Sequence, residues 1–98
     1  MERPASVVAA SLERKGMTPS ENHHHMYRKT IDGVTTLVTR MSHGSTTIGD
    51  GLGKLMAAQC ALQLREFWDL VDCTLSAEEW DLLVKQRCTD GRNPFLRR

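Results

Sequence analysis

Three adjacent histidines, His23, His24 and His25, are the residues of this 98-residue chain whose type and spacing could do chemistry. Imidazole has an ordinary pKa of about 6.5, so a histidine can act as a general acid or base near neutral pH. A fourth histidine, His43, follows further along the chain. Residues 1–54 also contain basic side chains that could hold the phosphates of a polyanion: Arg28, Lys29, Arg40 and Lys54. Inert surface histidines and solvated charges would give the same pattern, so spacing alone does not decide the chemistry.

Two other interpretations of the histidine run make different predictions. A tag remnant belongs at a chain terminus, whereas these histidines follow a predicted helix and open a predicted hairpin. In a metal site on a strand, His23 and His25 would share one face and His24 would point to the other. His43 could add a third ligand, but no carboxylate or cysteine stands at ligand spacing to complete a tetrahedral set. We therefore expect no metal and no other cofactor.

Composition limits the class of protein. Hydrophobic residues make up 40% and charged residues 26% of the chain, which is ordinary for one globular domain. The apolar runs are too short to span a membrane, and Glu13, Arg14 and Lys15 interrupt any secretory signal. We therefore expect a cytoplasmic protein with no membrane partner. The three cysteines are odd in number and widely spaced, so they are predicted to be small, semi-buried apolar residues rather than disulfides or zinc ligands.

The elements that position the histidines can be predicted from the residues around them. Residues 4–15 are predicted to form a helix that stops at Gly16. Residues 17–22 are polar and contain a proline, so at best they form an irregular edge strand. Residues 23–30 and 34–41 are predicted to pair as a hairpin around an Asp-Gly turn, a dipeptide that accepts positive φ. This hairpin would carry the histidine run and three of the four basic residues.

A second long helix is predicted after the hairpin. Ser45, Thr46 or Thr47 could cap it, and its apolar stripe would run from Ile48 to about residue 61. The sequence GDGLGK at its start lacks the lysine followed by serine or threonine that a phosphate-binding loop needs. The glycines there are better explained by close backbone packing or by late initiation of the helix.

Two shorter helices are predicted in the C-terminal third. Residues 64–72 are amphipathic, and residues 76–86 begin with a capping box in which Ser76 and Glu79 satisfy each other's backbone. The second of these helices would turn Trp80, Leu83 and Val84 inward, and residues 89–98 would form a frayed tail. The element order favours an α+β fold with one antiparallel sheet and helices covering one of its faces.

The run from Leu12 to Leu62 resembles the HicA (YcfA) family of toxins, which are messenger-RNA interferases. Leu12–Gly16 is similar to the family's Leu-x-x-x-Gly helix end. His24-His25-Met26-Tyr27 is similar to its His-His-x-aromatic strand opening, and Ser42-His43-Gly44 to the turn after its last strand. The resemblance implies a double-stranded-RNA-binding-domain-like α-β-β-β-α fold with a three-stranded antiparallel sheet, over residues 4–62. It makes residues 63–88 a helical extension and 89–98 a tail of a single domain, 1–98.

The resemblance also implies an activity and a site. The protein would be the toxin of a type II toxin-antitoxin system, acting in the stress response as a metal-independent endoribonuclease on messenger RNA. His24 takes the place of the family's catalytic histidine, and His43 could assist proton transfer. Asn22-His23 stands where the family has Gly-Ser, so His25 and His23 remain alternatives for the catalytic position.

The basic residues and the extension complete the prediction. RNA would be held by the four residues Arg28, Lys29, Arg40 and Lys54. A HicB-like antitoxin protein would be the partner, and the extension could form a homodimer or meet that antitoxin. A protein of another class, a non-catalytic RNA-binding or protein-interaction module on the same fold, remains the alternative.

Overall fold

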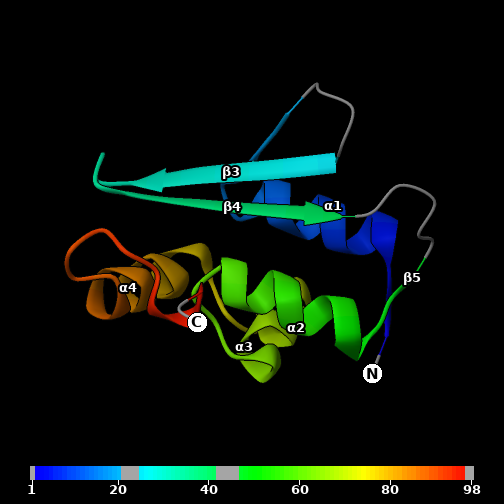
Figure 1. Ribbon diagram of the computed structural model, residues 1–98. Coiled ribbons are helices and arrows are strands. Elements are labelled where there is room, and N and C mark those ends of the chain that lie inside the picture. Colours follow the sequence, from blue (N-terminus) through cyan, green and yellow to red (C-terminus); the bar gives the residue numbers. More distant parts are fainter. Residues whose placement is uncertain (1, 21–24, 42–46, 97–98) are drawn as a thin grey trace.

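The computed structural model describes residues 2–20, 25–41 and 47–96, and Figure 1 shows the path of the chain. It is an α+β structure whose sheet of three antiparallel strands is accompanied by four α-helices. In chain order the elements are β1 (Arg3–Pro4), α1 (Ala5–Arg14), β2 (Thr18–Pro19), β3 (His25–Ile31), β4 (Thr35–Met41), β5 (Thr47–Ile48), α2 (Asp50–Gln59), α3 (Leu64–Val71), α4 (Ala77–Arg87) and a 3₁₀ turn, η1 (Pro94–Leu96).

Helix α1 confirms the helix predicted over residues 4–15, with its ends shifted by one residue. Pro4 precedes the first turn as the N-cap and belongs to β1, so it does not occupy the first helical position. Gly16 follows the helix with φ 101°, a left-handed conformation that glycine adopts without steric cost. Val8 and Leu12, one turn apart, are fully buried and anchor the helix to the core.

The predicted hairpin is confirmed as β3 and β4. Asp32 and Gly33 have φ of 56° and 69°, the positive values that a type I′ turn requires, and the Val34 amide donates to the Ile31 carbonyl at 3.1 Å. The strands pair from Ile31 with Thr35 to His25 with Met41, so Val34 is one extra residue in the loop. This register decides which side chain of each strand faces the helices.

Strand β2 is the predicted irregular edge strand, and it is only two residues long. Thr18 pairs with Arg28, and Pro19 pairs with Tyr27. The Ser20 amide donates to the Met26 carbonyl at 2.7 Å, so the narrow, hydrogen-bonded positions of this pair fall on Ser20 and Thr18. Pro19 lies between them, where a strand needs no N–H toward its neighbour, which is why the proline is tolerated.

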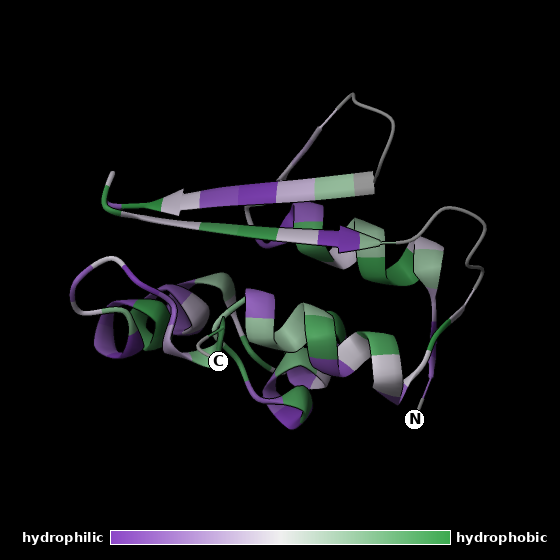
Figure 2. Cartoon of the chain, in the orientation of Figure 1, coloured by the Kyte–Doolittle hydropathy of each residue, from purple (hydrophilic) through white to green (hydrophobic). Residues whose placement is uncertain are grey.

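The helices cover one face of the β2-β3-β4 sheet and leave the other uncovered. Helices α2, α3 and α4 lie on one side of the hairpin, and no described helix lies on the opposite side (Figure 1). Hydrophobic residues occur along the helices, whereas the middle of β3 is hydrophilic (Figure 2). The sheet contributes alternate residues to the core between sheet and helices: Tyr27, Ile31, Leu37 and Met41, all at most 6% exposed.

The start of α2 differs from the prediction. The helix begins at Asp50 with Gly49 as its N-cap, and Thr47–Ile48 instead forms β5, which pairs antiparallel with β1. Ile48 is fully buried, but as a strand residue rather than as part of a helical stripe. Ser45 and Thr46, the other proposed caps, lie outside the described residues.

The glycine-rich start of α2 shows both predicted features, late initiation and close packing. The helix starts at Asp50, three residues after Thr47, the last of the proposed caps. At Gly53 an added Cβ would lie 2.8 Å from Cζ2 of Trp68, closer than two carbon atoms can approach. The missing side chain therefore lets α2 and α3 pack closely.

The two C-terminal helices are confirmed as α3 and α4, and the predicted Ser76–Glu79 capping box is present. Trp80 and Val84 are fully buried, with Leu83 partly buried against the core, so these helices belong to the same core as the hairpin. The expectation of a frayed tail is wrong as far as residue 96. Asn93 donates to the Ala58 carbonyl at 2.7 Å, which ties η1 to the end of α2. No helix in the described part of the chain is long and apolar enough to cross a membrane.

The cysteines agree with the prediction at two of three positions. Cys60 and Cys88 are buried. Burial raises the pKa of the Cys60 thiol to about 12, because a thiolate would lose its hydration there. Cys73 is exposed and has φ 68°, so the expectation of a semi-buried apolar residue is wrong for it.

Candidate functional site

The four histidines lie at the edge of what the structure describes. His23, His24 and His43 are outside the described residues, and of His25 only the backbone is described. His25 is the first residue of β3, and its register partner is Met41, the last residue of β4. The described ends of the two strands therefore meet at one end of the sheet. The catalytic assignments to His24, His25, His23 and His43 stay predictions.

Two of the predicted RNA-binding residues come together on the uncovered face of the sheet. Arg28 and Arg40 are both exposed, and both are even-numbered residues whose neighbours on either side point toward the core. Arg28 pairs with Val38 and Met26 pairs with Arg40, which makes the two arginines diagonal neighbours. Diagonal neighbours on adjacent strands are about 7–8 Å apart at their Cα atoms. The structure thus places two guanidinium groups side by side on one face.

Among the described residues, this outer face carries positive charge and no carboxylate. Its described side chains on β2, β3 and β4 are two arginines together with neutral residues, namely Thr18, Met26, Thr30, Thr36 and Val38. Within the described chain, neither Arg28 nor Arg40 forms an ion pair or a side-chain hydrogen bond. Guanidinium groups without protein partners are available to a ligand, and their planar fork suits phosphate oxygens.

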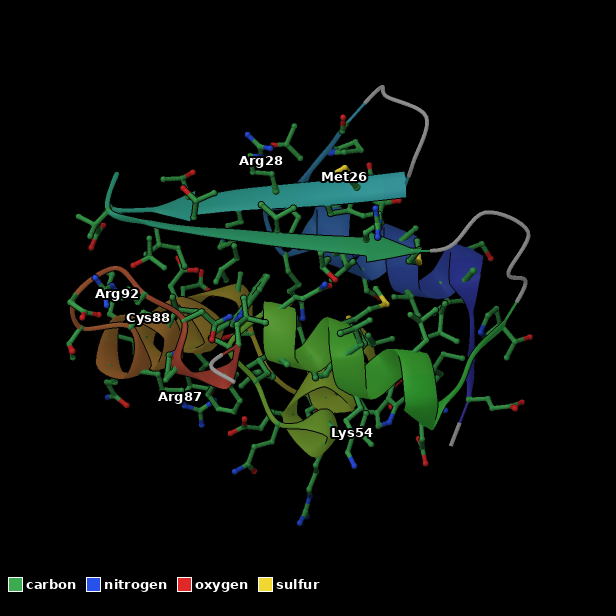
Figure 3. The ribbon with its side chains drawn as sticks, viewed as in Figure 1. Met26, Arg28, Lys54, Arg87, Cys88 and Arg92 are labelled. Carbon is green, nitrogen blue, oxygen red and sulfur yellow. The ribbon has the colours of Figure 1, made fainter. Side chains whose placement is uncertain are left out.

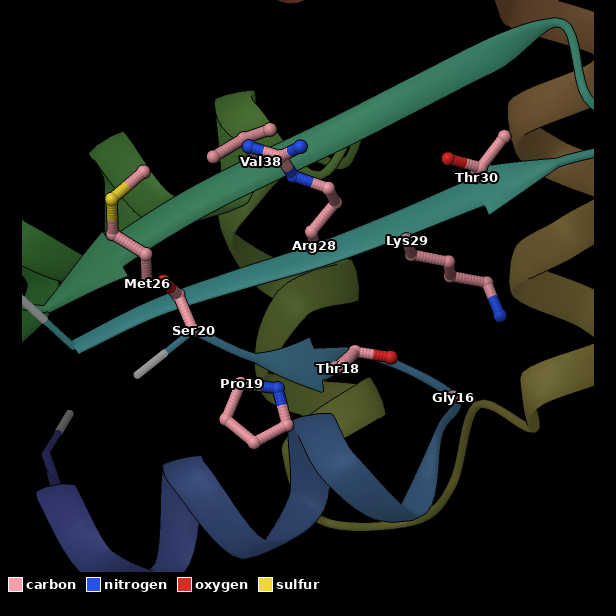
Figure 4. A pocket seen from close by; sticks show the side chains of 9 residues that line it. All are labelled: Gly16, Thr18, Pro19, Ser20, Met26, Arg28, Lys29, Thr30 and Val38. Carbon is pink, nitrogen blue, oxygen red and sulfur yellow. The ribbon is translucent and has the colours of Figure 1, made fainter. Parts of the chain in front are cut away.

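A hollow of about 590 Å³ adjoins Arg28. Thr18 and Pro19 of β2 form one wall, and Met26 and Val38 lie at its other side (Figure 4). The hollow exists because β2 ends after two residues and leaves part of the β3 edge uncovered. Its lining combines the apolar groups of Pro19, Met26 and Val38 with Arg28, Lys29 and the hydroxyl residues Thr18, Ser20 and Thr30, which suits a ligand that has both an apolar part and an anionic group.

Lys29 differs from its neighbour Arg28, because its ammonium group is occupied inside the protein. Its Nζ donates to the Lys15 carbonyl at 3.1 Å and lies 3.2 Å from Oδ1 of Asp81. It also lies 5.3 Å from the centre of the Trp80 ring, and the side chain is 11% exposed. In Figure 4 the Lys29 side chain extends away from Arg28. The structure therefore places this predicted RNA-binding residue where it joins the sheet to α4.

Lys54 lies in a different layer from the two arginines. It is exposed on α2, and Figure 3 shows it on the side of the molecule opposite Arg28 and Met26. Of the four predicted RNA-binding residues, the structure brings Arg28 and Arg40 together on the outer face. Lys29 lines the hollow beside Arg28, but its ammonium group is bonded inside the protein, and Lys54 lies in another layer.

The inner face of the same strands holds polar groups that sequence reasoning did not single out. The Thr39 hydroxyl, fully buried, donates to Oε1 of Gln59 at 2.7 Å and joins β4 to α2. Burial and, to a smaller extent, the Glu13 carboxylate raise the pKa of Tyr27. Strand alternation was the signal that could have found this division, because it puts Arg28 and Lys29 on opposite faces.

The described residues contain no cluster of three or more histidine, cysteine, aspartate or glutamate side chains that could hold a metal ion. On the outer face, the described residues supply positive charge and an apolar surface beside it. Comparisons with protein-family models, with curated proteins and with solved structures found no match.

Proposed function

We propose that this protein binds RNA on the outer face of the β2-β3-β4 sheet and cleaves it without a metal, as the toxin of a type II toxin-antitoxin system. The observation that carries the proposal is the diagonal pair Arg28 and Arg40, two exposed guanidinium groups for which the described residues provide no ion-pair partner, on a sheet face that no described helix covers. The activity would take place in the cytoplasm, on messenger RNA, under stress.

The element order supports the family resemblance. The described core runs α1, β2, β3, β4, α2, the order that a double-stranded-RNA-binding-domain-like fold requires, with the short pair β1-β5 added at its edge. We propose that the core belongs to this fold and that α3 and α4 are additions to it. An uncovered sheet face with exposed arginines is one of the surfaces on which proteins contact nucleic-acid backbones and bases.

The charge distribution supports an RNA ligand over a neutral one. Each phosphate held by an arginine releases a counterion, so binding should weaken as salt rises, with a slope of about 0.7 per contact for a single strand. The hollow beside Arg28 offers Met26 and Val38 as apolar surface for a base, while the arginines face the phosphates.

The cleavage step belongs to the histidine run. His24, or one of its neighbours His25 and His23, takes the proton from a ribose 2′-hydroxyl, and the 2′-oxygen then attacks the adjacent phosphorus. The bond to the 5′-oxygen breaks, and that oxygen receives a proton from a second group, for which His43 is the candidate. The products are a 2′,3′-cyclic phosphate and a 5′-hydroxyl, and the step requires no metal. Such proton transfer contributes about 10²–10⁴-fold to a rate.

The proposed assignment is tested with purified protein and a single-stranded RNA substrate. Alanine is introduced separately at His23, His24, His25 and His43, and cleavage is measured with and without EDTA. We expect His24→Ala to lose about 10²-fold or more of the rate, EDTA to have no effect, and the products to carry cyclic or 3′-phosphate ends.

The binding half of the proposal has its own variants. Arg28→Gln with Arg40→Gln should lower RNA affinity and reduce the salt slope by about 1 to 1.5, whereas Lys54→Gln, the same charge change in another layer, should leave the slope unchanged. Binding with no cleavage would favour the non-catalytic RNA-binding module. Equal effects of Arg28/Arg40 and Lys54 changes, or no RNA binding at all, would contradict the proposed face.

The proposed partner is a HicB-like antitoxin protein. A toxin of this kind arrests growth when its antitoxin is absent, so induced expression of the wild type should stop growth and His24→Ala should not. We expect a HicB-like protein to be encoded beside this chain. Its co-expression should restore growth, and it should copurify with the protein.

A further inference from the structure

Strand β4 is an edge strand with unpaired backbone groups. The sheet order is β2-β3-β4, and the described chain pairs β4 with β3 alone. The Ser20 amide donates to the Met26 carbonyl, so the backbone of Met26 points toward β2 and away from β4. Its partner Arg40 therefore points its own N–H and C=O away from β3. By the same alternation, Val38 and Thr36 do so too.

The two edges of the sheet are built differently. β2 is two residues long and contains Pro19, features that make an edge unsuitable for pairing with another strand. β4 runs for seven residues without a proline, and its register with β3 is continuous over its length. Continuous, proline-free edges are the ones that accept a further strand.

We infer that β4 is the pairing edge of a homodimer, in which β4 of one copy joins β4 of a second copy, antiparallel, around a two-fold axis at Val38. This register pairs all three β4 residues whose backbone groups point away from β3, namely Thr36, Val38 and Arg40. Val38 lies opposite Val38 of the other copy, and Thr36 lies opposite Arg40 at both ends. Each opposed pair exchanges two backbone hydrogen bonds.

The side chains of β4 fit this register. No two like charges face each other, because the one charged residue, Arg40, meets a threonine hydroxyl. The two valines meet at the axis as a β-branched pair, which suits a pleated surface. Other registers are worse. An axis at Arg40 brings the two Arg40 side chains opposite each other, and an axis at Leu37 or Thr36 moves Arg40 past the end of the partner strand. An axis at Thr39 pairs Val38 with Arg40 but leaves Thr36 opposite a residue beyond β4.

Helix α2 adds an apolar contact on the core side of the same edge. Gln59 hydrogen-bonds to Thr39 of β4, and Leu55 lies one turn earlier on that face of α2. Leu55 is 54% exposed, so this apolar side chain is available for a contact. In the dimer the two Leu55 side chains would lie along the line where the two copies meet.

The inference goes beyond the proposed function and does not depend on it. Pairing would produce one six-stranded sheet whose outer face carries Arg28 and Arg40 of both copies. A single strand pair is small for a protein interface, so we expect a dissociation constant in the micromolar range.

The test measures mass in solution by sedimentation velocity, from about 1 to 500 µM, for the full chain without RNA. Thr36→Glu should pair with Arg40 of the other copy and tighten the dimer, whereas Thr36→Arg should oppose it and loosen the dimer. Each change occurs twice per dimer, so each should shift the dissociation constant roughly 3- to 10-fold. The matched controls are Thr30→Glu and Thr30→Arg, which alter the same face one strand away from the edge.

A third variant removes a donor. Val38→Pro deletes an N–H that points outward and leaves the β3–β4 bonds intact, so the monomer should fold and the dimer should be lost. Circular dichroism confirms folding of each variant. A wild type that stays monomeric at every concentration would overturn the inference. A dimer that responds equally to changes at Thr30 and Thr36 would also overturn it, whatever the RNA experiments show.

Discussion

The two faces of the β3–β4 hairpin differ in whether their positively charged side chains are bonded to other groups of the protein. Arg28 and Lys29 are neighbours in the chain, yet the arginine is exposed on the outer face and the lysine is held by Lys15, Asp81 and the Trp80 ring. Some charged groups on the helical side are paired in the same way as Lys29. Arg87, for example, makes two hydrogen bonds to Glu66, at 2.8 and 2.7 Å, and a third to the Ala61 carbonyl.

This difference separates the charged groups that stabilise the fold from those that are available to bind a ligand. A cation whose hydrogen bonds are already made inside the protein contributes to stability, and recruiting it for a ligand would break those bonds. A cation without partners contributes little to stability and can pair with a phosphate at no internal cost. Stability and RNA affinity should therefore respond to changes on opposite faces of the same hairpin.

The largest expected effect is on the inner side, at Trp80. It is fully buried, donates from Nε1 to the Cys60 carbonyl at 3.0 Å, and carries Lys29 over its ring. Trp80→Ala should lower the free energy of unfolding by about 3–5 kcal/mol, measured by urea denaturation. Leu82→Ala, on the exposed side of the same helix, is the control and should stay within about 0.5 kcal/mol. Similar losses for both variants would mean that α4 is not anchored through Trp80.

A smaller and more specific effect should separate the two neighbours in β3. Lys29→Met keeps the length of the stem but leaves Asp81 without its ion-pair partner, so it should cost about 1–2 kcal/mol of stability. Arg28→Met should stay within about 0.5 kcal/mol. RNA affinity should show the reverse order when both are measured on folded protein at fixed salt: a clear loss for Arg28→Met and none for Lys29→Met. If both variants lost RNA affinity, Lys29 would be an RNA-binding residue, as the sequence predicted.

The hairpin and the C-terminal helices could be predicted because their signals are local. The Asp32-Gly33 turn and the Ser76–Glu79 capping box are each decided by a few adjacent residues, and both are present. The start of α2 could not be predicted in this way. Thr47 and Ile48 are equally good as a helix start or a strand, and only their pairing with Arg3 and Pro4, far away in the chain, decides between them.

The candidate site shows the same limit. Period-two alternation in β3 would have assigned Arg28 and Lys29 to opposite faces, but residue type alone made them equivalent. That Lys29 faces the covered side depends on where α4 packs, because Asp81 and Trp80 come from that helix. Lys54 was grouped with the arginines by sequence proximity, although its helix lies in another layer (Figure 3).

The smallest expected effect concerns the pH dependence of the paired charges. Hydrogen bonds from Arg87 and then from the Gln63 amide hold the pKa of Glu66 below its ordinary value, against an opposing effect of burial. Since the pKa in the folded state is below that in the unfolded state, the pair stabilises the fold above the unfolded-state value of about 4.3. That contribution is lost as pH falls through the folded-state pKa. Glu66→Gln should therefore lower the free energy of unfolding by about 1 kcal/mol at pH 7. The difference in unfolding free energy between variant and wild type should become smaller below about pH 4, measured by urea denaturation at a series of pH values.

The control for this series is Glu78→Gln, an exposed carboxylate on α4 for which no ion pair is found in the described chain. It removes the same charge and should change stability by at most about 0.5 kcal/mol, with little dependence on pH. The outer-face variant Arg28→Met should likewise follow the wild type through the acid range, because Arg28 has no carboxylate partner in the described chain to lose. If the Glu66→Gln gap stayed constant from pH 7 to pH 3, the Glu66–Arg87 pair would not be stabilising the fold through its charge. The contrast between paired helical charges and unpaired sheet charges would then fail on its helical side.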